Sequence, residues 1–122
     1  MKSLDKDTVS LLKKRVYDLA GCTPSSVNVY LNGKKLDKIK SFESYIDLYF
    51  KGQEDVKKYH EKVNPRWEVC VIPYDEFMQV SFVNSICTIR GGTHVNHVTD
   101  QICSKLMEII KKKHKKLEIK PY

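Results

Sequence analysis

A glycine pair in front of a helical pattern is the first feature of this chain whose residue types suggest chemistry. Gly91-Gly92-Thr93 precede that pattern, and backbone N–H groups at the start of a helix can bind phosphate. The segment lacks the GxxxxGK[ST] pattern of a P-loop and the GxGxxG pattern of a dinucleotide fold. Two interpretations stay open, a phosphate loop or a structural hinge capped by the threonine, and the ordinary use of glycine at sharp turns favours the hinge.

Side chains able to hold a metal or attack a substrate are sparse. His94 and His97 are three residues apart and could share a helix face, with Asp100 as the nearest acid. A zinc site needs more ligands than this, so the pair is interpreted as structural or solvated. Ser81 and Ser85 fall within a strand pattern and have no nucleophile-elbow motif. We therefore predict no catalytic residue, no cofactor-binding residue and no metal ligand.

The four cysteines are widely spaced and form no C-x-x-C pair. Three of them fall in apolar patterns, which favours buried free thiols in a reducing compartment. A disulfide framework or a zinc site is the alternative.

A lysine run is the remaining candidate for a functional site. The chain carries a net charge of +7, and Lys111, Lys112 and Lys113 concentrate charge at the end of a helical pattern. Successive helical residues are about 100° apart, so the three side chains fan around the axis. One interpretation is a solvated helix end favoured by the macrodipole. The other is phosphate contact without base specificity, for which lysine suits as a flexible point charge.

Local signals predict the elements of the first half. A helix over 4–20 is capped by Ser3 or Asp5 and stopped by Gly21. Its apolar stripe is Val9, Leu12, Val16 and Leu19. Strands over 27–31 and 34–39 flank the Asn32-Gly33 hairpin turn, and Ser41 caps a helix over 42–50. Residues 51–64 are polar and are predicted as a loop with some helical turns.

The second half is predicted to form a hairpin followed by a long helix. Strands over 66–72 and 77–88 should pair antiparallel through residues 74–76. Thr93 should cap a helix over 94–114, and residues 117–120 could begin another strand. The apolar stripe expected to bury that long helix is Val95, Val98, Ile102, Leu106, Ile109 and Ile110.

Length and composition fit one compact domain or pieces of two adjoining ones, with enough chain to bury a core. The chain has 122 residues, of which 41% are hydrophobic. No run approaches the roughly 20 apolar residues that span a bilayer, so no membrane partner is expected.

Five stretches, in order along the chain, resemble the eukaryotic type II DNA topoisomerases. The most specific is Phe82-Val-Asn-Ser-Ile86 followed by Gly91-Gly-Thr-His-Val95, and a GG-x-H after such a strand also occurs in bacterial gyrase. The others are Ser3–Asp7 with Lys14–Gly21, Val29–Leu36, Ser41–Tyr49 and Val63–Val71.

The resemblance implies an α+β fold that joins two domains. Residues 1–40 would be the C-terminal end of a GHKL ATPase domain, with its terminal helix and hairpin. Residues 41–122 would be the N-terminal part of the transducer, a partial sheet with a long packed helix of split βαβ type. A stand-alone basic α+β nucleic-acid-binding module without enzymatic activity is the alternative.

The resemblance also implies partners and cofactors for the parent enzyme. That enzyme would be a nuclear homodimer that uses ATP and Mg²⁺, breaks one DNA duplex, passes another through and reseals the first. The family's DNA-contacting lysine triplet matches Lys111, Lys112 and Lys113. The family's ATP-binding motifs lie upstream of the matched stretches, and its glutamine–threonine–lysine loop lies downstream. No nucleotide-binding or catalytic residue is therefore carried over, and this segment alone is expected to be inactive. Residues 51–62 also differ from the usual family loop.

Overall fold

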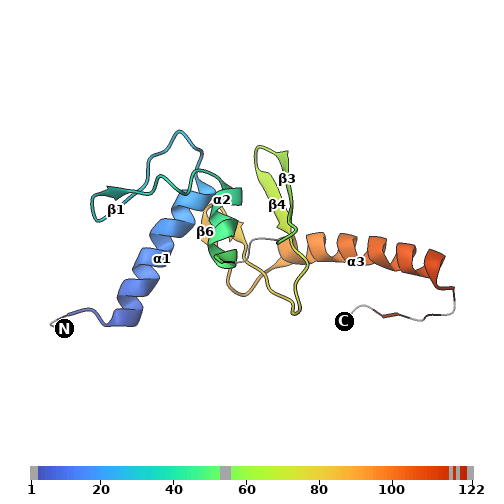
Figure 1. Ribbon diagram of the computed structural model, residues 1–122. Helices are drawn as coiled ribbons and strands as arrows, with labels where there is room; N and C mark the ends of the chain where they lie inside the picture. Colours follow the sequence, from blue (N-terminus) through green and yellow to red (C-terminus); the bar gives the residue numbers. More distant parts are fainter. Residues whose placement is uncertain (1–2, 53–55, 116, 118, 121–122) are drawn as a thin grey trace. The chain divides into compact units, whose positions relative to one another are not determined.

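The chain forms two compact units, residues 1–78 and 79–122. The computed structural model describes residues 3–52, 56–115, 117 and 119–120. Within these residues the architecture is mixed α/β, with α-helices and two-stranded antiparallel sheets (Figure 1). None of the described helices is both long enough and apolar enough to cross a membrane.

Helix α1 spans Lys6–Cys22 and begins at a polar cap. The Asp5 carboxylate accepts a hydrogen bond from the Thr8 N–H at 2.8 Å, as predicted for one of the two candidate caps. The predicted stop at Gly21 is wrong, because the helix continues through this residue, which is buried. The backbone N–H of Thr23 closes the helix on the carbonyl of Leu19 at 3.0 Å.

The first hairpin is formed by β1 (Tyr30–Leu31) and β2 (Lys34–Lys35). Its turn is the predicted one, since Asn32 and Gly33 have φ of 50° and 78°. Both strands are shorter than predicted. The Val27 N–H bonds to the Pro24 carbonyl, and the Ile39 N–H bonds to the Leu36 carbonyl, so both flanks curl into turns.

Helix α2 (Phe42–Ile46) continues into the 3₁₀ helix η1 (Asp47–Phe50), which together match the predicted helix over 42–50. Ser41 caps it through reciprocal hydrogen bonds with Ser44. Tyr45 and Ile46 of this helix, with Ala20 and Ile39, are the buried hydrophobic residues of the described chain.

The predicted loop over 51–64 is wrong for its second part, and residues 53–55 lie outside the described residues. Strand β3 (Tyr59–Asn64) pairs antiparallel with β4 (Trp67–Val71). Most of β3 is exposed, so it lacks the apolar alternation by which a strand is recognised. The predicted pairing of the strands over 66–72 and 77–88 is therefore wrong, because β4 has β3 as its partner.

The strand predicted over 77–88 is a tight hairpin instead. Strands β5 (Phe82–Val83) and β6 (Ile86–Cys87) pair antiparallel. Between them Asn84 and Ser85 have φ of 48° and 63°, the left-handed values of a two-residue hairpin turn.

Helix α3 spans Thr93–Lys113, and its N-cap is Gly92, so the prediction of Thr93 as cap is wrong. No residue of α3 is buried, and Leu106 and Ile109 are 52% and 43% exposed. The predicted apolar stripe is thus only partly covered within the described residues. The strand suggested for 117–120 is not formed at residues 117, 119 and 120, and residue 118 lies outside the described residues.

Candidate nucleic-acid interface and the junction that carries it

A three-residue polar cluster joins the β5–β6 hairpin to the first turn of α3; we call Ser81, Thr88 and His94 the His94 cluster. The Ser81 and Thr88 hydroxyl oxygens are 2.5 Å apart, and His94 Nε2 lies 3.1 Å from each of them. The Thr88 N–H also donates to the Ser81 carbonyl at 2.8 Å, at the base of the hairpin. Together these bonds hold the start of α3 against the end of the sheet.

Gln79 extends this cluster at the first residue of the second compact unit. Its side-chain amide donates to the Ile89 carbonyl at 2.9 Å, and its oxygen accepts from the Ser81 hydroxyl at 2.8 Å. These hydrogen bonds link the residues that follow β6 to those that precede β5.

The two glycines have backbone conformations that side chains disfavour. Gly91 and Gly92 have φ of 71° and 153°. A Cβ added to Gly92 would lie 3.0 Å from Cε1 of His94, so the imidazole lies close to one side of this exposed glycine. The Gly91 N–H is already bonded to the Thr88 carbonyl at 2.9 Å. The engaged N–H of Gly91 and the positive φ values of both glycines favour the hinge interpretation over a phosphate loop.

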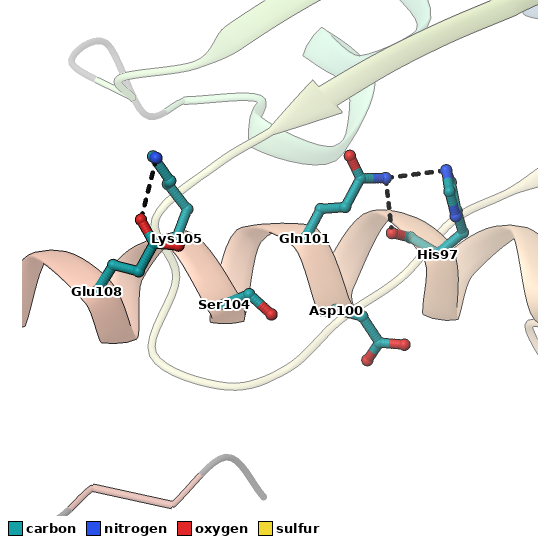
Figure 2. Close-up of a pocket in the computed structure, with 6 residues that line it drawn as sticks. All are labelled: His97, Asp100, Gln101, Ser104, Lys105 and Glu108. Atoms are coloured by element: carbon teal, nitrogen blue, oxygen red, sulfur yellow. Dashed lines mark hydrogen bonds and ion pairs between the residues drawn. The ribbon is translucent and has the colours of Figure 1, made fainter.

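The two histidines have different partners. His94 faces the two hydroxyl groups of its cluster, whereas His97 lies near Gln101, whose side-chain nitrogen is 2.9 Å from His97 Nε2. Figure 2 shows His97 and Gln101 on α3 with Ser104, Lys105 and Glu108, side chains of a single helix around an open depression. Lys105 pairs there with Glu108 at 3.1 Å.

The described residues contain no group of three His, Cys, Asp or Glu side chains able to hold a metal ion. The four cysteines are thiols rather than disulfides, and all are partly exposed where burial was predicted. Burial still raises the pKa of the Cys70 thiol, the largest of the effects on it.

Lys111, Lys112 and Lys113 occupy the last turn of α3, as the sequence predicts, and all three are exposed. Among the residues that the structure describes, none of the three forms an ion pair with an acidic side chain. The helix ends directly after them, where the His114 N–H bonds to the Ile110 carbonyl at 2.7 Å. The three ammonium groups can therefore meet an external polyanion.

The sequence did not predict a buried polar contact between α1 and α2 in the first unit. Asp18 of α1 and Tyr45 of α2 are 3% and 2% exposed and are hydrogen-bonded. The only sequence signal was indirect: Asp18 and Gly21 interrupt an otherwise ordinary helical pattern close to its end.

The sequence profile of the DNA gyrase B family matches residues 27–121. This chain belongs to the type II DNA topoisomerases. DNA topoisomerase 2-alpha of Cricetulus griseus is 53% identical over 121 residues, which cover 94% of this chain. The Gallus gallus protein of the same name is 50% identical and covers all of it.

The solved ATPase region of Saccharomyces cerevisiae topoisomerase II matches with a TM-score of 0.82 and 49% identity. That match covers 92% of this chain and 29% of the solved one. The chain spans only 8% of the length of the two curated relatives. The recognised family and the mixed α/β fold are thus confirmed, and the roles of individual residues and the domain boundary at 40/41 stay predictions.

Proposed function

We propose that this chain is part of an ATP-hydrolysing type II DNA topoisomerase and helps its ATPase region communicate with the rest of the enzyme. The parent would break one duplex, pass a second through the break and rejoin the ends. The observation that carries this proposal is the likeness to the ATPase region of yeast topoisomerase II, at a TM-score of 0.82 and 49% identity over 92% of the chain.

Within that enzyme the segment would couple ATP-driven gate closure to the DNA-cleaving core and contact DNA without base specificity. The exposed lysines at the end of α3 support the contact. Because three successive residues fan around the helix axis, they suit a duplex that crosses the end of the helix. The His94 cluster would fix the direction in which α3 presents them.

The remaining features are proposed for the parent enzyme: residues outside this segment bind ATP and Mg²⁺, and the protein is a nuclear homodimer. Residues 1–40 would end the GHKL domain and residues 41–122 would begin the transducer. The uncovered apolar side chains Leu106 and Ile109 support a transducer in which further sheet packs against α3. A stand-alone basic module is disfavoured by the high identity to DNA topoisomerase 2-alpha over nearly the whole chain.

The DNA contact is tested by replacing Lys111, Lys112 and Lys113 with alanine in the full-length protein and measuring duplex affinity at several salt concentrations. Each phosphate contact contributes about 0.9 to the slope of log K against log salt, so three contacts make the slope less steep by about 2.7. The matched control replaces Lys34, Lys35 and Lys38, which removes the same charge from the first unit. A slope that does not change in the Lys111–Lys113 variant rules out the phosphate contact.

The enzymatic proposal has its own test. Full-length protein should decatenate DNA circles only when ATP is present. Decatenation without ATP, or none with it, would contradict the proposed activity.

A further inference from the structure

Two residues that are far apart in sequence form the most buried polar contact in the first unit. The Tyr45 hydroxyl donates to Oδ1 of Asp18 at 2.7 Å, across the interface of α2 and α1. The side chains are 2% and 3% exposed, and Asp18 is the one buried polar or charged residue among those the structure describes. A buried hydrogen bond to a charged group is strongly directional and costly to break.

Further polar groups hold this contact in place. Lys14 Nζ lies 2.9 Å from both carboxylate oxygens of Asp18. On the other side, the Tyr45 and Tyr49 hydroxyl oxygens are 2.9 Å apart. Burial raises the pKa of Tyr45, and its bonds to Tyr49 and Asp18 raise it further, so the phenol keeps the proton that it donates.

The backbone of α1 approaches the same aromatic ring. A Cβ placed on Gly21 would lie 2.5 Å from Cγ of Tyr45, well inside van der Waals contact. The ring therefore packs on bare helix backbone one turn from the carboxylate that binds its hydroxyl (Figure 1 shows α2 beside the end of α1). Both ends of the Tyr45 side chain are fixed against α1, which leaves α2 little freedom to rotate.

We propose that Tyr45 is a positioning residue that couples ATP turnover to strand passage. Its hydrogen bond to Asp18 and its packing on Gly21 make α1 and α2 move as one body. The inference rests on the proposed function. The expected boundary between the ATPase end, 1–40, and the transducer, 41–122, falls between α1 and α2. A conformational signal that crosses this boundary would pass through the Tyr45 contact.

The test is the number of ATP molecules hydrolysed per strand-passage event in the full-length protein. Tyr45→Phe removes only the hydroxyl, and Tyr30→Phe removes one from a side chain that is 56% exposed on β1, which makes it the matched control. Asp18→Asn is a second variant that leaves an acceptor but removes the charge. Thermal unfolding of every variant separates loss of coupling from loss of fold.

The expected result is a ratio of ATP to strand passage that rises about fivefold or more in Tyr45→Phe, the size of a modest coupling between sites. Asp18→Asn should change the ratio in the same direction, and Tyr30→Phe should match the wild type. An unchanged ratio in a Tyr45→Phe protein that hydrolyses ATP would overturn the inference and leave the proposed function standing. Wild-type protein without ATP-dependent strand passage would overturn both.

Discussion

Helices α1 and α3 are held in opposite ways. α1 is fixed near its C-terminal end by close packing, where the buried residues Asp18 and Gly21 contact Tyr45 of α2. α3 has no buried residue and is fixed at its N-terminal end by the hydrogen bonds of the His94 cluster. The first helix is oriented by a helix–helix contact and the second by a polar junction.

This difference indicates that the α1–α2 contact and the α3 junction resist movement to different degrees. A close-packed contact with a buried carboxylate resists rotation, because any rotation breaks packing and hydrogen bonds together. A junction of partly exposed hydroxyl and imidazole groups opens at lower cost, since water can replace the lost partners. Local opening should therefore be rarer where α1 meets α2 than at the start of α3, and hydrogen exchange measures this directly.

Replacing Gly21 with alanine should produce the largest effect. The added Cβ would lie within 2.8 Å of three Tyr45 atoms, and we expect this overpacking to cost about 3 kcal/mol. An alanine gains roughly 1 kcal/mol over glycine within a helix, so the net loss is about 2 kcal/mol. Amide exchange in α1 and α2 of the full-length protein should accelerate about 30-fold.

Leu11→Ala is the control for that experiment, because Leu11 is 64% exposed on the same helix. In the Leu11→Ala variant, amide exchange near Tyr45 should stay close to that of the wild type. If Gly21→Ala slows exchange instead, helix propensity outweighs the contact and the close approach of Tyr45 does not hold α1.

Gly92→Ala should weaken the α3 junction rather than the α1–α2 contact. The φ of 153° is accessible to glycine almost alone, and the added Cβ would meet His94 at 3.0 Å. We expect a loss of about 1.5 kcal/mol, seen as roughly tenfold faster exchange in the first turns of α3 and little change in α1. Equal acceleration in both helices would show that the two regions do not open separately.

His94→Ala should have a smaller effect, because it removes the imidazole but leaves the Ser81–Thr88 pair in place. The loss of its bonds to two hydroxyl groups should cost about 1 kcal/mol, or about fivefold in exchange at the start of α3. His97→Ala is the matched control, since His97 lies 2.9 Å from Gln101, a residue of α3 itself. Equal effects of the two substitutions would remove the special role of His94.

Sequence signals were sufficient where the structure is decided locally. Asp5 and Ser41 cap their helices, and Asn32-Gly33 turns its hairpin, because each depends on neighbours a few residues away. The position of Lys111–Lys113 at the end of α3 followed from helical periodicity. The candidate interface was therefore predictable as a place on a helix.

Features that depend on distant partners were missed. Glycine is typical of a helix end, but Gly21 lies within α1. It leaves room for the ring of Tyr45, which belongs to another helix. Strand β3 is mostly exposed and is defined by pairing with β4 rather than by its own pattern. Ser85 takes a left-handed turn conformation that its residue type does not suggest. For Gly21 and β3, contacts with other elements override the local preference.

The smallest expected effect is a difference in alkaline stability that isolates the Tyr45 hydroxyl. Its pKa is raised above the ordinary value of 10 in the folded chain, chiefly by burial, so folding favours the protonated phenol. That contribution is fully present below pH 10 and is lost as the pH rises above it, because the unfolded chain then releases a proton that the folded chain retains. Between pH 9.5 and 10.5 the wild type should lose under about 1 kcal/mol more than Tyr45→Phe, measured as exchange in α1 and α2 after correction for the intrinsic rate. Identical pH profiles would mean that the phenol ionises as readily in the folded chain as in the unfolded one, and the α1–α2 contact would then be as accessible to water as the junction of α3.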